Sequence, residues 1–203
     1  ANVSGSEVIQ RFTFDPQQGV TPSPAVVGLA ELDEMSISVV AEKESWLTTF
    51  HWTGDQPPDD ELWWTIVTPN LSYLFTGVNQ DGMQQTSVGY AATPFQFWSG
   101  TMVYRFQFVA SQYHRGRVRI AWEPNGFDTD PNGMNISYSK IVDLSEMRDV
   151  EIAVAWGQEI GYRVVGSPWI YRYKVPGGGI KAYSGTFGNG TLNVTVVNDL
   201  TSP

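Results

Sequence analysis

One acidic segment has the residue types and the spacing of a cation site. Asp128-Thr-Asp130-Pro-Asn132-Gly133 matches the first half of an EF-hand calcium loop, in which alternate oxygen ligands surround the ion. The twelfth position of that loop must supply a bidentate glutamate, and this position is Ser139 here. We therefore interpret the segment as an Asx-rich turn, and keep Asp128, Asp130 and Asn132 as candidate ligands for a metal ion shared between subunits.

A second acidic segment contains four carboxylates around a pair of prolines. Asp55, Asp59, Asp60 and Glu61 are close enough in sequence to form an acid–base pair or a metal site. Such chemistry needs a carboxylate whose pKa is shifted by burial or by a close charge, and no apolar sequence surrounds these four. We therefore expect a solvated loop.

The chain has two histidines, His51 and His114, and no cysteine. These numbers exclude a His-rich metal site and any thiolate chemistry. A Ser-His-Asp triad stays open, because its members come from distant positions in a sequence, but no Gly-x-Ser-x-Gly elbow supports one. We predict structural roles for both histidines and no catalytic site.

The only basic cluster comprises His114, Arg115, Arg117 and Arg119. Clustered cations bind either phosphate groups or an acidic surface of another protein. The whole chain carries 12 Lys and Arg against 21 Asp and Glu, a formal net charge of −9, which opposes nucleic-acid binding by this chain alone. We expect the cluster to contact a neighbouring subunit, with RNA as the alternative, and we expect no cofactor.

Two strands must position this cluster. From Thr101 to Ala110 apolar and polar residues alternate strictly, and Arg117–Trp122 repeats the pattern after a basic turn. A period of two residues predicts half-buried strands. Together with the alternation of later segments, this pattern predicts that Arg105, Arg119 and Glu151 point away from the core. It predicts burial of Phe106, Phe108, Ile120, Trp122, Ile152, Val154, Val194 and Val196.

Short strands separated by turn residues recur along the chain, which is typical of a sandwich or a barrel. Two short helices are predicted, at Gly28–Asp33 and at Gln84–Tyr90. The other predicted strands are Glu7–Phe14, Ser36–Glu42, Trp46–Trp52, Leu62–Thr68, Val150–Trp156, Trp169–Val175 and Thr191–Val197.

The composition fits one domain that packs against other proteins. Charged residues make up 16% of the 203, well below the ~25% of ordinary soluble proteins, which leaves a weakly polar surface. The absence of cysteine fits assembly in a reducing compartment. The chain starts at Ala1 without an initiator methionine, as a polyprotein product or a trimmed chain would. No apolar run is long enough to span a membrane.

The segment Phe95–Pro124 resembles the central strand pair of picornavirus-like capsid proteins (order Picornavirales), above all the dicistrovirus-, iflavirus- and marnavirus-like members. It combines a Trp-x-Gly lead-in, a long strand, Ser-Gln-Tyr-His-Arg-Gly-Arg-Val and a strand that ends in Pro. Ile136–Leu144 and Asn189–Pro203 fit the same pattern. The resemblance implies an eight-stranded antiparallel jelly-roll β-sandwich of two four-stranded sheets with one or two short helices. We expect a single domain over residues 1–203, with an N-terminal arm at about 1–18 and a C-terminal tail at 199–203.

The resemblance also implies a function. The chain would be a structural subunit of the icosahedral capsid of a small non-enveloped positive-strand RNA virus. It would assemble with related jelly-roll subunits around the genomic RNA, in the host cytoplasm, and end in the virion without a catalytic step. One subunit of the resembled group carries an Asp-Asp-Phe motif tied to precursor self-cleavage, and Asp59-Asp60-Glu61 lacks the Phe.

Two other functions stay open. Eight tryptophans and the acidic composition would suit a secreted jelly-roll lectin or carbohydrate-binding module that stacks sugars on exposed indole rings. A β-sandwich hydrolase would use the acidic loop. The simpler account of the tryptophans is core packing.

Overall fold

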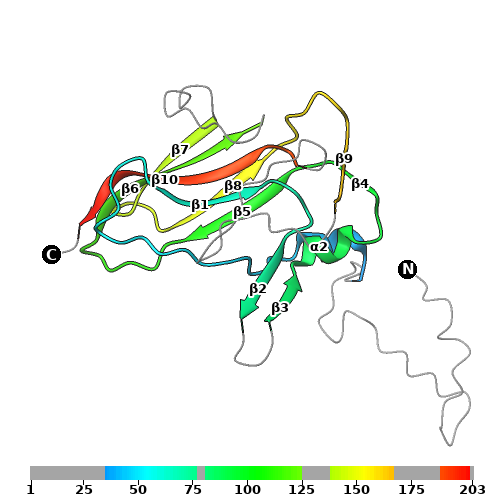
Figure 1. Cartoon of the computed structure of the whole chain (residues 1–203), viewed down its shortest axis with the longest axis horizontal. Helices are drawn as coiled ribbons and strands as arrows, with labels where there is room; N and C mark the ends of the chain where they lie inside the picture. Colours follow the sequence, from blue (N-terminus) through cyan, green and yellow to red (C-terminus); the bar gives the residue numbers. More distant parts are fainter. Residues whose placement is uncertain (1–34, 77–80, 125–137, 167–187, 202–203) are drawn as a thin grey trace, which may run out of the picture.

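A computed structural model describes residues 35–76, 81–124, 138–166 and 188–201 of the chain (Figure 1). Within these ranges the elements are strands apart from two helices of 6 residues each. They are α1 Ile37–Glu42, β1 Glu61–Ile66, β2 Ser72–Thr76, β3 Asp81–Gln85, α2 Ser87–Ala92, β4 Phe97–Trp98, β5 Met102–Gln107, β6 Arg115–Glu123, β7 Tyr138–Asp143, β8 Asp149–Val154, β9 Arg163–Val164 and β10 Thr191–Thr201. Neither described helix is long and apolar enough to cross a membrane.

The main layer is a four-stranded antiparallel sheet in the order β1-β10-β6-β7. The last strand of the described chain therefore lies inside the sheet, between two strands from the first two-thirds of the sequence. Val194 of β10 stands opposite Trp63 on one side and Ile120 on the other. This register puts the apolar residues of three strands on one face of the sheet.

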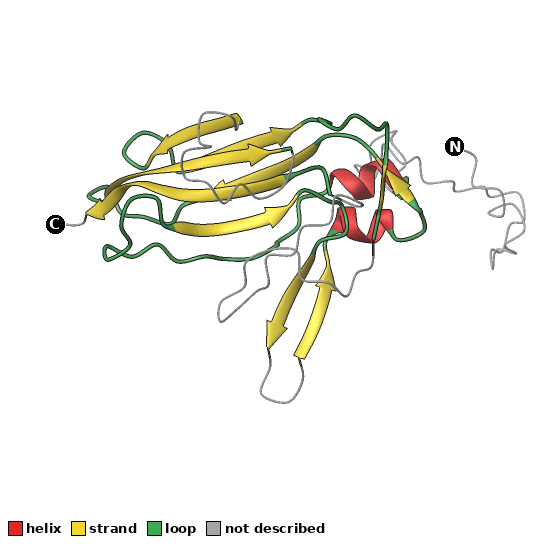
Figure 2. Ribbon diagram, turned by 45° about the horizontal axis from the view of Figure 1, so that its top comes forward, coloured by secondary structure: helices red, strands yellow, loops and turns green. Residues whose placement is uncertain are grey.

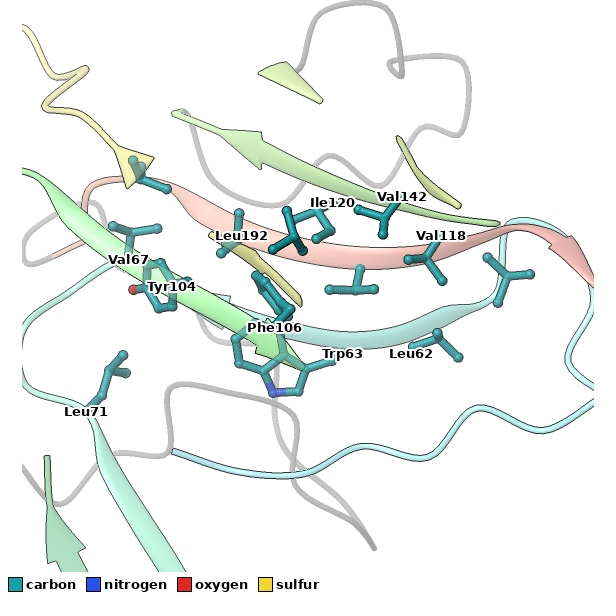
Figure 3. Close-up of a cluster of buried hydrophobic side chains, with 14 residues drawn as sticks. Leu62, Trp63, Val67, Leu71, Tyr104, Phe106, Val118, Ile120, Val142 and Leu192 are labelled. Atoms are coloured by element: carbon teal, nitrogen blue, oxygen red, sulfur yellow. The ribbon is translucent and has the colours of Figure 1, made fainter. Parts of the chain in front are cut away.

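The antiparallel pair β5–β8 forms the second layer. Side chains from both layers meet in one cluster of buried apolar residues (Figure 3). Trp63 of β1 and Phe106 of β5 touch edge to face there, with ring centroids 5.7 Å apart. Two further pairings, β2 with β3 and β4 with β9, complete the described part, and the all-β fold with short helices is confirmed.

Most of the predicted strand faces are confirmed. Arg105 and Glu151 are exposed, and Arg119 is half-buried on the face opposite Val118 and Ile120. Five of the residues that were predicted to be buried are buried in the structure: Phe106, Ile120, Val154, Val194 and Val196.

Phe108, Trp122 and Ile152 are only half-buried, although all three pack against the core cluster. Phe108 lies past the last residue of β5, and Ile152 lies on β8, which pairs with β5 alone among the described strands. Trp122 lies near the end of β6, where its ring is tilted over Tyr138 at a centroid distance of 5.4 Å. Alternation in the sequence predicts on which face of a strand a side chain lies, but it does not predict how completely the opposite layer covers that side chain.

The prediction of a strand at Ser36–Glu42 is wrong, because this segment contains α1. Its β-branched residues suit a strand, but α1 packs against α2 instead (Figure 2). Tertiary packing has overridden local propensity here. Trp46–Trp52 forms no ladder with any described strand, so the strand predicted there is not observed.

The second predicted helix is shifted by a few residues, because Thr86 caps it. The Thr86 hydroxyl accepts a hydrogen bond from the Gly89 N–H at 3.1 Å, and donates to the Leu71 carbonyl at 2.9 Å. The bond to the Thr86 hydroxyl satisfies the Gly89 backbone N–H, which has no carbonyl partner within the helix, so α2 begins at Ser87. The hairpin of β2 and β3 has no counterpart among the predicted strands.

The prediction of a tail at 199–203 is wrong for its first residues. β10 continues to Thr201, which pairs with Arg115 at the start of β6. Register shifts after Val196 let the strand follow the twist of β6 to its end. The expected N-terminal arm at 1–18, the strands Glu7–Phe14 and Trp169–Val175, and the helix Gly28–Asp33 lie outside the described residues.

Candidate intersubunit surface

The basic cluster begins at the turn that joins β5 to β6. His114 Nδ1 lies 3.2 Å from the backbone nitrogen of Ser111 and 2.7 Å from its hydroxyl oxygen. The Ser111 hydroxyl also accepts the Tyr113 N–H at 3.3 Å, and the Ser111 carbonyl accepts the His114 N–H. Ser111 and His114 therefore stabilise the turn through hydrogen bonds within it, which is a structural role for His114.

A serine beside a histidine could also supply two of the three members of a Ser-His-Asp catalytic triad. Among the described residues no carboxylate hydrogen-bonds to His114, and Ser111 stands exposed at the turn. A triad needs a third group that orients the imidazole and a site that stabilises the oxyanion. His51 is exposed as well. The geometry of the turn supports no acyl-transfer chemistry.

The three arginines of the cluster share one face of β6. Arg115, Arg117 and Arg119 alternate with Gly116, Val118 and Ile120, which are all buried. Alternation along a strand sends the two sets to opposite sides of the sheet. The sequence-predicted basic residues are thus brought together on the outer side of the β6–β7 pair, which we call the basic face.

Each guanidinium on the basic face has a different environment. Arg117 Nε donates to Asp143 Oδ2 at 2.8 Å, and these two residues are cross-strand partners in the β6–β7 ladder. Arg119 Nε is buried with no hydrogen-bond partner among the described residues. Arg115 is exposed and donates to the Gln112 carbonyl at 3.2 Å, and no ion pair forms from it within the described part of the chain.

Asp143 is held in its charged form. The Ser145 hydroxyl donates to it at 2.6 Å, and together with Arg117 and the Ser145 backbone N–H it lowers the pKa of Asp143 well below the usual range. The charge of Arg117 is therefore met inside the chain. This leaves Arg115 as the arginine of the basic face whose charge is most available to another molecule.

Exposed apolar side chains lie beside Arg119 on β7 and in the turn before β6. Ile141 of β7 stands opposite Arg119 and is exposed, as are Val109 and Tyr113 in the turn. Arginine combined with aromatic and aliphatic side chains is the composition of the inner part of protein–protein interfaces. The basic face and the turn beside it therefore have the chemistry of a contact surface.

The acidic loop is anchored to the main sheet. The Asp59 N–H donates to the Val196 carbonyl at 2.8 Å, and the Val196 N–H donates to the Asp60 carbonyl at 2.9 Å. Asp55 is exposed, and a hydrogen bond from Thr53 lowers its pKa, which is the opposite of what a general acid needs. No three His, Asp or Glu side chains gather to hold a metal in the described ranges. Asp128, Asp130 and Asn132 lie outside those ranges.

The tryptophans do not form a sugar-stacking platform in the described part of the chain. Trp63 and Trp64 are buried, and Trp98 and Trp156 pack edge to face with ring centroids 5.0 Å apart. Trp46, which is 61% exposed, is the one described tryptophan that is mostly open to solvent. A single exposed indole gives the lectin interpretation little support.

Sequence reasoning missed one organising residue, Asn189. It is fully buried, and its side-chain amide donates to the Ala155 carbonyl at 2.9 Å while its Oδ1 accepts the Gly157 N–H at 3.3 Å. Its own carbonyl accepts the Trp122 indole N–H at 2.8 Å. The signal in the sequence is Asn-Gly, because Gly190 has a φ of +78° and a β-carbon there would meet the Glu123 carbonyl.

Two curated relatives match most of the chain. It is 27% identical over 175 residues to the structural polyprotein of cricket paralysis virus, a match that covers 84% of this chain and 19% of the polyprotein. It is 26% identical over 160 residues to the genome polyprotein of deformed wing virus, covering 76% of this chain and 5% of that protein. The chain thus spans a fifth or less of the length of these relatives. No protein-family model matches the sequence.

Solved structures match the fold over the whole chain. A marine algae virus of the order Picornavirales contains a chain that is 26% identical with a TM-score of 0.78, covering 100% of this chain and 78% of that one. The empty capsid of Triatoma virus gives 25% identity and a TM-score of 0.71, covering 95% and 74%. Black queen cell virus gives 23% identity and a TM-score of 0.73, covering 96% and 75%. The architecture derived above is therefore the one found in these virus particles.

Proposed function

We propose that this chain, a picornavirus-like capsid protein by sequence and fold, is a jelly-roll subunit of an icosahedral virus shell. The observation that carries the proposal is the match to the marine algae virus chain, at 26% identity and a TM-score of 0.78 over the full length of this chain. The relation to the structural polyprotein of cricket paralysis virus supports it over 84% of the chain. The virion is then where the protein acts.

The mechanism is assembly through lateral contacts. Arg115 and Ile141 offer charge and apolar area on the outer side of the β6–β7 pair, and Val109 and Tyr113 add exposed apolar area in the turn before β6. In a shell each subunit meets several neighbours, and a standard pairwise interface buries about 1,600 Å² in total. We propose that the basic face and the turn before β6 lie in one of these contacts, with an acidic surface of a related capsid subunit opposite Arg115.

The finer parts of the mechanism are proposals that rest on the same resemblance. The partners are related jelly-roll chains in a hetero-oligomeric shell, assembled in the host cytoplasm around the genomic RNA. Residues 1–18 lie on a neighbouring chain as an arm. RNA contact through the basic face is the second use of Arg115, and the net charge of −9 opposes it.

We propose that the chain performs no catalytic step. The support is the turn at Ser111, where the histidine contact has no carboxylate behind it among the described residues. The acidic loop supports this as well, because it is tied to β10 through its backbone.

Sedimentation tests the proposal directly. The structural precursor is expressed, processed to its mature chains and spun through a gradient, with folding followed by circular dichroism. We expect particles of pentamer size or larger that contain this chain. A folded chain that stays monomeric across salt and pH would contradict a shell function and return the lectin interpretation to consideration.

A further inference from the structure

The acidic loop and the turn before β6 lie at the same end of the main sheet. β1 and β6 both run antiparallel to β10, so they are parallel to each other and both start where β10 finishes (Figure 1). The acidic loop leads into β1, and the turn beside Arg115 leads into β6. Two strand spacings separate β1 from β6, which is about 10 Å. The sheet thus brings two segments that are distant in the sequence to one surface.

The end of β10 holds both segments in place. On one side, a β-carbon on Gly54 would stand 3.1 Å from the Leu200 carbonyl oxygen, so the acidic loop lies close against the strand. On the other side, Thr201 is the ladder partner of Arg115, and its hydroxyl donates to the Arg115 carbonyl at 3.4 Å. Charged side chains on a backbone that is already fixed lose less entropy when they bind a partner.

The charges of these two segments are not matched inside the chain. Asp55, Asp59 and Arg115 are exposed, and no ion pair joins the acidic loop to Arg115 in the part of the chain that the structure describes. The hydrogen bond from Thr53 lowers the pKa of Asp55 and keeps its carboxylate charged. One end of the sheet therefore presents carboxylates and a cation side by side, all of them open to solvent.

Apolar groups flank the charges in both segments. Pro57 and Pro58 are exposed within the acidic loop, and Tyr113 is exposed just before Arg115. A proline pair has a restricted backbone and offers a rigid apolar surface on which an aromatic ring packs well. An arginine beside an aromatic ring is typical of interface centres. The two segments therefore complement each other in apolar area as well as in charge.

We infer that Arg115 of one copy of this chain pairs with Asp55 and Asp59 of a second copy, and that Tyr113 packs on the proline pair between those carboxylates. The inference rests on the proposed function and deepens it, because it identifies the acidic surface opposite Arg115 as the acidic loop of another copy. The contact joins two copies of the same chain rather than two related chains.

Two arguments favour a second copy as the partner. In a symmetric assembly the same patch recurs on every copy, so a chain that carries both halves of a contact completes it with its own copies. The signs of the charges then select the arrangement. Asp199 at the end of β10 is also exposed, so carboxylates outnumber Arg115 at this end of the sheet. Two such ends repel when carboxylates face carboxylates, and attract when Arg115 faces the acidic loop.

Disulfide cross-linking between two single-cysteine variants tests the contact. The native chain has no cysteine, so only the introduced thiols can link its copies to each other. One precursor carries Asp55→Cys and the other carries Arg115→Cys, and the two are expressed together, processed and oxidised. We expect linked pairs of this chain in which mass spectrometry finds the peptide of position 55 joined to the peptide of position 115. Each chain has one cysteine, so every such link joins two copies.

Asp55→Cys expressed with Lys140→Cys is the matched control, because Lys140 is exposed on the opposite face of the β6–β7 pair. We expect about tenfold less linked product from it, since a disulfide forms only between α-carbons within about 7 Å of each other. Particles without the link between positions 55 and 115, or equal linkage in the control, would overturn the inference. The absence of any particle is a separate result, because it contradicts the proposed function and with it the inference.

An exchange of charges tests the ion pair itself. Arg115→Glu and Asp55→Lys are introduced singly and together in the precursor, and the yield of particles is measured by sedimentation. We expect each single variant to lower the yield. The double variant should recover it by about threefold or more over Arg115→Glu, because the pair is restored with its signs reversed. A double variant that assembles no better than the weaker single variant would show that Arg115 meets a different surface.

Discussion

The indole ring of Trp122 lies directly over the α-carbon of Gly157. A β-carbon at position 157 would stand 2.3 Å from Cη2 of that ring, closer than any real contact allows. The ring is fixed from the other side by its hydrogen bond to the Asn189 carbonyl. The loop after β8 can therefore cross the end of the sheet only where a residue has no side chain.

Replacement of Gly157 by alanine should destabilise the domain by about 1–3 kcal/mol, because the bound ring has little room to move. Chemical denaturation of the isolated chain measures the change. Gly161→Ala is the matched control, since a β-carbon there has no atom within 4 Å, and it should change the free energy of unfolding by less than about 0.5 kcal/mol. Equal effects of the two variants would contradict the packing described here.

Truncation of Phe106 to alanine should cost about 3–5 kcal/mol, because it leaves a cavity beside Trp63 in the core. Val103→Ala, three residues earlier on the same strand, is the control, because its side chain is 60% exposed. Thermal or urea unfolding distinguishes them. If Val103→Ala were the more damaging of the two, the register of β5 would be off by one residue.

Asn189→Ala should cost about 1–3 kcal/mol, because it removes the hydrogen bonds of a fully buried side chain to the Ala155 carbonyl and the Gly157 N–H. Asn193→Ala on β10 should cost far less, since the side-chain Oδ1 of Asn193 has no hydrogen-bond partner among the described residues. The comparison uses urea midpoints at pH 7.

The stabilising effect of Asp143 should depend on pH. Its pKa is lowered in the folded chain by Ser145 and Arg117, so its contribution is present above the unfolded value near 4 and is lost as the pH falls through the acid range. Wild type should exceed Asp143→Asn in stability at pH 7, and the gap should shrink at pH 3. A gap of the same size at both pH values would show that the charge is not what stabilises the turn.

Charge reversal at Arg115 should weaken assembly without unfolding the chain. Arg115→Glu leaves the core untouched, because the side chain is exposed, and it repels an acidic partner surface. Lys140→Glu is the matched control, with the same change of charge on the opposite face of the β6–β7 pair. Sedimentation of processed precursor measures both. Equal loss of particles in the two variants would remove the basic face from the contact.

Strands β5 and β6 were predictable because only one face of each is buried, so the alternation around Phe106 and Ile120 indicates which side chains face the core. The pairing of Arg117 with Asp143 was not, because it depends on a ladder between positions that the sequence separates by 26 residues. Helix α1 was mistaken for a strand because propensity does not reveal that α2 lies beside it. The hydrogen bonds of Asn189 require the end of β6 and the loop after β8 to meet the turn before β10, and no local sequence pattern predicts that.

The place of β10 in the sheet has a consequence for synthesis. Among the described strands β1 pairs with β10 alone, so Trp63 gains its cross-strand partner Val194 only after more than a hundred further residues have been translated. Non-local pairing of this kind gives a high contact order, and such chains fold slowly. The central sheet cannot close while the polypeptide is still being translated through its first two-thirds. A ribosome-bound fragment ending before residue 191 would display β1 and β6 as bare edges, and these are the surfaces that a chaperone would have to cover.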